Sequence, residues 1–155
     1  MMGGGGGGGG GQMQQIQQEI EAIEEEQEAI EAEIESLRDE QTAIDEAIEA
    51  IETLDSGDTV QVPLGGDAYL RAEIQDIDEV IVSLGGGYAA ERDEDGAIDS
   101  LGTKQDTIDD RIEDLQSDIA ELESEAEQMQ QQAQQMQQQQ MQQMMQQQQE
   151  EGDGE

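Results

Sequence analysis

Residues 13–51 read MQQIQQEIEAIEEEQEAIEAEIESLRDEQTAIDEAIEAI, with a mostly apolar residue at steps that alternate between three and four. Gln27 and Gln41 are the polar residues at these positions, and a second run with the same alternation starts at Ile98. The two runs are Met13, Ile16, Ile20, Ile23, Gln27, Ile30, Ile34, Leu37, Gln41, Ile44, Ile48, Ile51 and Ile98, Leu101, Gln105, Ile108, Ile112, Leu115, Ile119, Leu122, Ala126, Met129, Ala133, Met136. A seven-residue repeat kept this long predicts left-handed coiled-coil helices.

The segment between the two runs, residues 58–92, has a different pattern, with β-branched residues divided by glycines. It predicts strands over 59–64, 68–74, 79–84 and 88–92. The turns Gly65-Gly66-Asp67 and Gly85-Gly86-Gly87 make these strands two β-hairpins. An isolated hairpin is marginal in water, so we expect these strands to pair with other chains. The candidate assembly residues are Val60, Val62, Leu64, Tyr69, Leu70, Ile74, Val80, Val82, Leu84 and Tyr88.

Changes of composition divide the chain into five segments. We expect a flexible glycine leader without helix over 1–11, a coiled-coil helix over 12–54 and the double hairpin over 58–92. A second coiled-coil helix over 93–149 has a Gln/Met-rich distal end, and a polar tail follows over 150–155. Gly57 suits the end of the first helix, and Asp93 or Asp95 suits the N-cap of the second.

If the hairpins form a bend, the first helix runs back along the second and facing positions add up to a constant. Placing Ile51 opposite Ile98 matches the apolar positions of both runs and puts Gln41 and Gln105 in adjacent layers. Such polar core residues typically fix register at some cost in stability. The predicted fold class is therefore α+β: a long antiparallel two-helix coiled coil joined by two β-hairpins, which assemble into a barrel between subunits.

The same register places Gln12 opposite about residue 137, so that the last methionines project beyond the paired helices. Methionine is flexible and polarizable, which suits surfaces that accept many apolar partners. Packing in the seam is the alternative for Met136, and a disordered Gln-rich tail is the alternative for the later methionines. The candidate residues for contact with other proteins are Met13, Ile16, Met136, Met141, Met144 and Met145.

The charge balance and missing residue types exclude several classes of function. The chain has 41 acidic and 5 basic residues, a net charge of −36, and contains neither His nor Cys. It therefore lacks catalytic triads built on His and zinc sites built on thiolates, and its few cations cannot neutralise a nucleic-acid backbone. Without a long apolar run or signal peptide, we expect a cytoplasmic protein with no membrane or nucleic-acid partner.

Two features that could suggest a ligand site are better explained otherwise. Residues 91–96 partly resemble a calcium loop, but Gly102 occupies the last ligand position, which needs a bidentate Glu. Helix initiation explains these acids equally well. The glycine runs lack the strand and helix context of nucleotide sites. We therefore expect no enzyme activity, no metal and no cofactor.

A long helix, two hairpins and a long returning helix resemble the archaeal prefoldin α subunit. The more specific likeness is Val62-Pro63-Leu64-Gly65-Gly66 with Ala68-Tyr69-Leu70, and residues 80–91, VIVSLGGGYAAE. The resemblance implies a hexamer of two α and four β-type subunits, with a β-barrel platform and coiled-coil arms. It implies that the arm tips hold unfolded client proteins without ATP and pass them to a group II chaperonin. The excess of acid looks like a haloarchaeal, halophilic form of the family.

Two other functions fit the same residues. The chain could be a purely structural coiled-coil assembly protein without client capture. It could also be an acidic protein that sequesters basic clients, and binding of that kind should collapse in molar salt.

Overall fold

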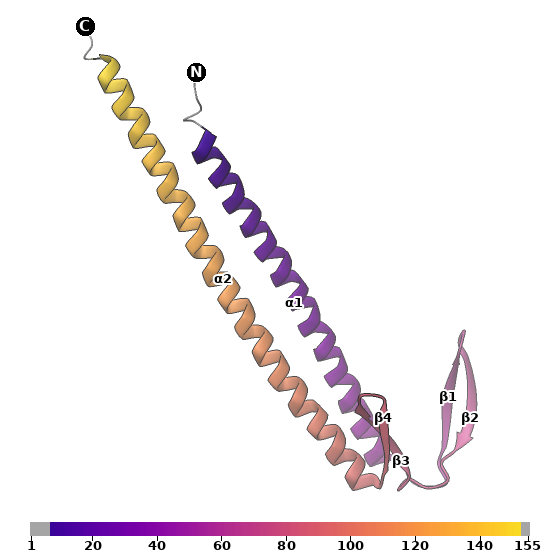
Figure 1. Ribbon diagram of the computed structural model, residues 1–155. Helices are drawn as coiled ribbons and strands as arrows, with labels where there is room; N and C mark the ends of the chain where they lie inside the picture. The colour runs from indigo at the N-terminus through magenta and orange to yellow at the C-terminus, as the bar shows by residue number, and fades with distance from the viewer. Residues whose placement is uncertain (1–6, 153–155) are drawn as a thin grey trace. The chain divides into compact units, whose positions relative to one another are not determined.

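The computed structural model describes residues 7–152 and contains two long helices and four short strands (Figure 1). Their order is α1 (Gly7–Thr53), β1 (Thr59–Gly65), β2 (Ala68–Glu73), β3 (Val80–Gly85), β4 (Tyr88–Arg92) and α2 (Glu94–Gly152). The predicted sequence of helix, two hairpins and helix is confirmed. The chain forms two compact units, described in turn: a hairpin unit, Ile34–Glu113, and a helical unit, Met1–Glu33 with Asp114–Glu155.

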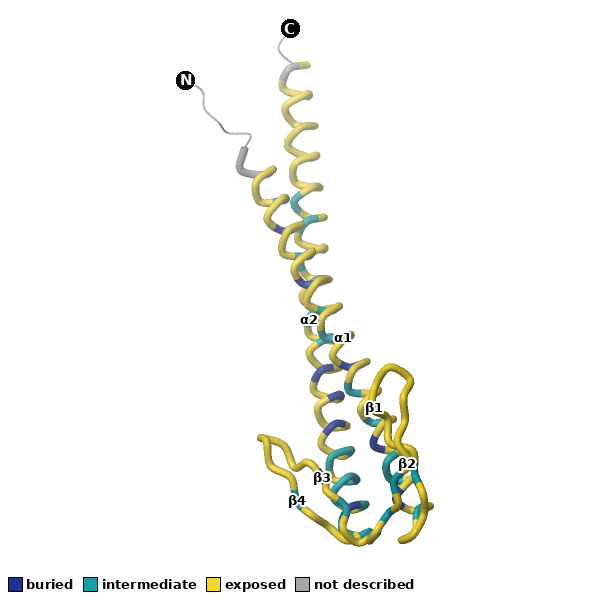
Figure 2. Tube along the Cα trace, turned by 90° about the vertical axis from the view of Figure 1, so that its right-hand side faces the viewer, coloured by how far each residue is buried: buried dark blue, intermediate teal, exposed yellow. Residues whose placement is uncertain are grey.

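In the hairpin unit, α1 and α2 pack against each other through the predicted seam. Ile44 on α1 and Ile108 on α2 are buried, and buried residues recur at intervals along the helices (Figure 2). Side-chain amides bridge the helices, since Gln41 Nε2 donates to Asp109 and Gln105 Nε2 donates to Asp45. These contacts join positions early in one helix to positions late in the other, which confirms the antiparallel direction.

In the helical unit, residues 7–33 of α1 and residues 114–152 of α2 carry the predicted seam. Ile16, Ile23 and Leu115 are buried, and the other seam positions as far as Met136 are half-buried. Gln27 is a polar residue in this seam, and its buried Nε2 has no hydrogen-bond partner. An orphaned buried donor of this kind costs roughly 1–3 kcal/mol. The heptad prediction is therefore confirmed on both helices, including its polar positions.

The two hairpins share one backbone design. In each, two residues with left-handed backbone form the turn: Gly66 and Asp67 (φ 59° and 62°) in the first, and Gly86 and Gly87 (φ 61° and 81°) in the second. This is the type I′ turn, whose twist matches the twist of paired strands. The register shifts by one residue before each turn, between Pro63 and Gly65 and between Ser83 and Gly85.

The second hairpin, β3–β4, packs onto the helices of its own chain. Val82 is only 4% exposed and lies in a cluster with Ile51 and Ala97, against which Val80 and Ile98 also pack. Val82 is one of the candidate assembly residues; the structure buries it within its own chain, and its part in assembly stays a prediction. The ends of α1 and α2 offer it an apolar site within the chain, so it is buried before any partner arrives.

The helix boundaries follow local chemistry. Asp93 is the N-cap of α2: its Oδ1 accepts a hydrogen bond of 2.8 Å from the Gly96 amide. Gly57 has the expected left-handed backbone, φ 92°, but lies in the turn after α1 rather than at its last position.

Both helices extend further than the sequence suggested. α1 begins at Gly7. We expected no helix in the glycine leader, and for Gly7–Gly11 that expectation is wrong. α2 continues to Gly152, beyond its expected end at residue 149. Adding glycines to an existing helix costs about 1 kcal/mol each relative to Ala, but needs no new nucleus. The remainder of the expected leader and tail lies outside the described residues.

Candidate protein-binding surfaces

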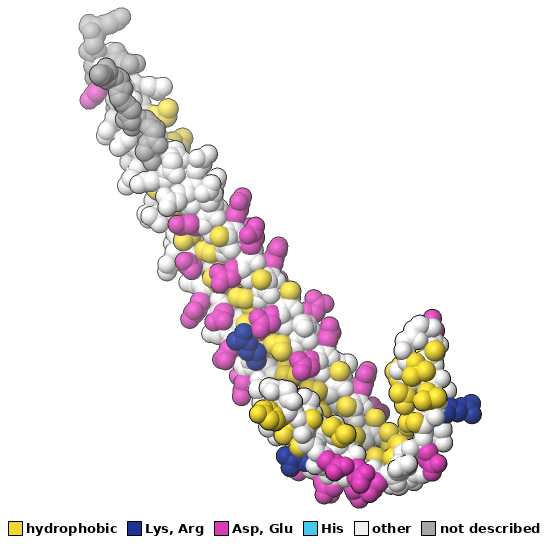
Figure 3. Space-filling model, turned by 45° about the vertical axis from the view of Figure 1, so that its right-hand side comes forward, with side chains coloured by type: hydrophobic (Ala, Val, Ile, Leu, Met, Phe, Trp, Pro, Cys, Tyr) yellow, Lys and Arg dark blue, Asp and Glu magenta, His cyan; other side chains and the backbone are white. Residues whose placement is uncertain are grey.

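Exposed apolar side chains cover the first hairpin on both faces. Val62 and Leu70 are paired across the strands, as are Pro63 and Tyr69, and neighbouring pairs point to opposite faces. Val62 is 40% and Leu64 65% exposed, although both are large and apolar. Figure 3 shows hydrophobic side chains gathered over this hairpin. Exposed apolar patches of this kind are typical of surfaces that contact another molecule.

The second hairpin has one apolar face buried and one exposed. Opposite Val82, on the outer side, lies Ile81, and Tyr88 at the turn is 77% exposed. Ile81 is 75% exposed and was missed among the assembly candidates. The sequence did not indicate that Ile81 is exposed, because β3 is apolar at consecutive positions and has no alternation that would show which face points outward.

The other candidate assembly residues divide by exposure. Val60, Ile74 and Val80 are half-buried, whereas Val62, Leu64, Tyr69, Leu70, Leu84 and Tyr88 are exposed. Their part in assembly remains a prediction.

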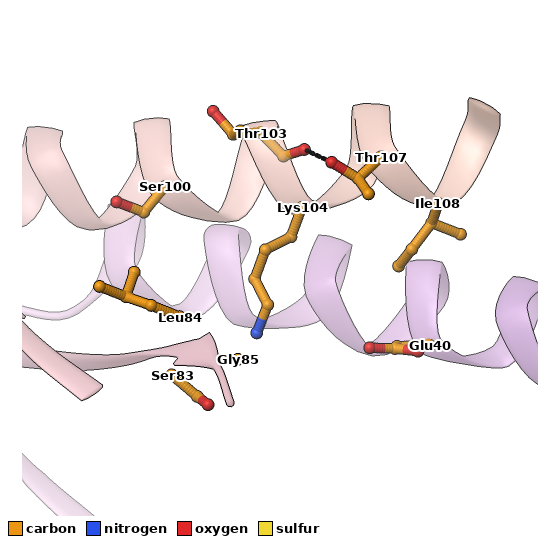
Figure 4. A pocket seen from close by; sticks show the side chains of 9 residues that line it. All are labelled: Glu40, Ser83, Leu84, Gly85, Ser100, Thr103, Lys104, Thr107 and Ile108. Carbon is orange, nitrogen blue, oxygen red and sulfur yellow. Dashed lines mark hydrogen bonds between the residues drawn. The ribbon is translucent and has the colours of Figure 1, made fainter. Parts of the chain in front are cut away.

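A groove of about 620 Å³ lies between the end of β3 and the two helices of the hairpin unit. Leu84 and Ile108 supply apolar walls, and Lys104 extends from α2 toward Gly85 and Glu40 (Figure 4). The α2 side of the groove also carries hydroxyl groups, and the hydroxyl of Thr107 donates to a backbone oxygen of its own helix. Lys104 is the single lysine of the chain.

The second candidate surface is the end of the helical unit. The seam closes at Met13 and Met136, both half-buried, and Ile16 behind them is buried. A groove of about 230 Å³ at this place is lined by Gln12, Gln15, Ile16, Glu19, Gln132 and Met136. The predicted register placed the same residues at the end of the paired helices.

Beyond Met136, α2 continues with every side chain exposed up to residue 150. Met141, Met144 and Met145 are each 68% exposed. Their spacing of three and four puts them on one face of the helix. The candidate contact residues thus form two groups: three methionines are available on α2, while Met13, Ile16 and Met136 pack in or near the seam.

The exposed methionines do not continue the seam, which the sequence analysis missed. Extending the alternation past Met136 places glutamines at positions 140, 143 and 147. Met141 and Met144 each lie one position after a seam position and Met145 lies two positions after Gln143, and each residue turns an α-helix by about 100°. They therefore face another direction than the seam, as counting the repeat onward could have shown.

Within residues 7–152, no group of acidic side chains is arranged to hold a metal ion, and neither helix is apolar enough to cross a membrane. Asp93, the middle acid of the possible calcium loop, caps α2 instead.

Comparison with known proteins decides the family. A family model described as "Prefoldin subunit" matches residues 16–139. The chain belongs to the prefoldin family. The prefoldin subunit alpha of Haloarcula marismortui is 72% identical over 106 residues, which cover 68% of this chain and 69% of that relative. The prefoldin subunit alpha of Halorubrum lacusprofundi is 73% identical over 67 residues, covering 43% and 44% of the two chains.

A solved structure agrees with these relatives. A cryo-EM structure of filamentous PFD from Methanocaldococcus jannaschii matches with a TM-score of 0.50 and 26% identity, over 74% of this chain and 92% of that one. The resemblance to prefoldin α subunits is confirmed. Relatives from haloarchaea at this identity also agree with a halophilic, acidic prefoldin.

Proposed function

We propose that this prefoldin subunit belongs to a cytoplasmic, ATP-independent chaperone complex of two α and four β-type subunits. The complex holds non-native proteins at the ends of its coiled coils and passes them to a group II chaperonin. The observation that supports this best is the exposed end of α2, where Met141, Met144 and Met145 lie on one helical face.

The hairpins are suited to assembly. The first hairpin has apolar side chains on both faces and unpaired strand edges, so it gains most by pairing with strands of other subunits in a barrel. The second hairpin is already attached to the helices through Val82, and presents its outer face with Ile81 and Tyr88.

Several weak tips acting together explain capture without a deep site. Each tip contributes a few apolar contacts, and linking them in one complex raises their effective concentration for a single client. Methionine side chains adapt to different partners, which suits clients of unrelated sequence.

The test is to remove the exposed end of α2 and keep the assembly. A chain lacking residues 137–155, combined with β-type subunits in 3 M KCl, should form a complex but lose most of its suppression of client aggregation, measured by light scattering. A finer variant changes Met141, Met144 and Met145 to Gln, which has a similar helix propensity. Its matched control changes Gln116, Ser117 and Ser124, exposed on the same helix, to Ala.

Full suppression by the truncated complex would contradict the proposed site. A full-length complex that assembles but suppresses nothing would favour the purely structural function instead.

A further inference from the structure

Two segments of the helical unit carry no charged side chains, in an otherwise strongly acidic chain. Residues 1–18 and 128–149 contain no Asp, Glu, Lys or Arg, whereas every cation and all but four of the acids lie in residues 19–127. We call the described part of these segments, residues 7–18 and 128–149, the neutral tip. In Figure 3 the acidic side chains stop short of it, apart from those near the C-terminus.

Helix formation does not require this neutrality. Glutamine and glutamate have nearly the same helix propensity, so glutamates at these positions would build the same helix. Pairing of the helices does not require it either. Next to the seam, Glu21, Glu24 and Glu25 are exposed on α1, and Ile23 between them is still buried.

The exposed side chains of the neutral tip also suit contact with polypeptide. Bringing a carboxylate against a partner removes water from a charge, which is costly, whereas a carboxamide loses less. Each glutamine offers two N–H donors and an acceptor oxygen, the same groups that an unfolded backbone leaves unpaired. Met141, Met144 and Met145 add apolar contacts beside them, each 68% exposed.

Charge then separates the possible clients. A basic polypeptide would find its strongest attraction along the carboxylates of residues 19–127, and would need no neutral surface. An acidic polypeptide is repelled there and can come into close contact only where carboxylates are missing. We therefore infer that the neutral tip selects acidic, unfolded polypeptides as clients. This inference rests on the proposed function.

The test uses one unfolded client in two charge states. Reduced and alkylated lysozyme is basic, and succinylation of its lysines makes the same chain acidic. Both are labelled, and their Kd for the complex with β-type subunits is measured by fluorescence anisotropy in 3 M and 1 M KCl. The tip variant changes Gln137, Gln140 and Gln148, which surround the methionines, to Glu. The matched control adds the same charge by changing Gln116, Ser117 and Ser124 to Glu.

The wild-type complex should bind the succinylated client at least as tightly as the basic one. The tip variant should weaken binding of the succinylated client roughly tenfold in 1 M KCl, and less in 3 M KCl, where screening is stronger. Its affinity for the basic client should change less than twofold, and the control variant should keep both affinities.

Three results would overturn the inference in distinguishable ways. Wild-type binding of the basic client alone, or equal loss of both clients in the tip variant, removes the charge selection but leaves client capture intact. No binding of either client by the wild type removes the proposed function as well.

Discussion

The two hairpins share a pattern of five residues but lie in different environments. Val60, Val62, Leu64, Gly65 and Gly66 recur twenty positions later as the same residue types, and both hairpins have the same turn and register shift. Yet Val62 is 40% exposed and its counterpart Val82 is 4% exposed. Local sequence therefore determines the hairpin, and packing against the helices determines whether its apolar residues serve this chain or another.

The largest expected effect separates these two valines. Val82→Asp buries an unpaired carboxylate and should destabilise the isolated chain by more than about 3 kcal/mol. Val62→Asp places the same group in water and should change its stability by less than about 0.5 kcal/mol. Urea unfolding in 3 M KCl, followed by circular dichroism, measures both. Equal costs would show that the hairpins are not different in the free chain.

Val62→Asp should instead affect the assembly of the complex. Val62→Asp should prevent the native complex with β-type subunits from assembling, because its carboxylate would lie in the proposed interface. An unchanged complex mass by analytical ultracentrifugation would remove Val62 from that interface.

Substitutions of the turn glycines should give smaller effects that again differ between the two hairpins. Gly66→Ala and Gly86→Ala both force a side chain into left-handed backbone, at about 1–2 kcal/mol. Because the second hairpin is packed on the helices, Gly86→Ala should lower the stability of the whole chain. Gly66→Ala should only speed amide hydrogen exchange in β1 and β2, and a matching loss of global stability would contradict this.

A next smaller effect concerns the junction between β4 and α2. Asp93→Ala removes the cap on the Gly96 amide and should cost about 1 kcal/mol in unfolding experiments. Asp95→Ala is the matched control and should cost less than half as much, since Asp93 provides the cap. The reverse ranking would assign the cap to Asp95.

The smallest difference lies at the last turn residue, Asp67 in one hairpin and Gly87 in the other. Both have positive φ, which aspartate tolerates better than most residues. Gly87→Asp should therefore cost only a few tenths of a kcal/mol, measured by thermal unfolding. Gly87→Val is the contrast and should cost clearly more, because a β-branched residue does not tolerate that backbone.

The coiled coil could be predicted because its signal is repeated and local. Each helix buries one stripe, and matching the two stripes gave the register that Gln41 and Gln105 now show. The hairpins could be predicted for the same reason, since glycines at fixed places define their turns. The N-cap was narrowed to two aspartates, and only the structure chose Asp93.

The environment of each hairpin could not be predicted from the same pattern. Val62 and Val82 have the same residue types two positions away on each side, Val and Leu, and the burial of Val82 depends on Ile51 and Ala97, which lie in other elements. The orphaned amide of Gln27 has a similar origin. The sequence marked it as polar in the seam, but not that its Nε2 would lack the partners that Gln41 and Gln105 find.

The groove beside β3 gives this molecule a built-in chemical reporter. Because Lys104 is the single lysine, an amine-reactive dye can modify a side chain at one position only, where the second hairpin meets the helices. Its labelling rate relative to the terminal amine would follow opening and closing of that junction without any engineered substitution. Crosslinking from the same position would identify which neighbouring chain lies within reach of the groove.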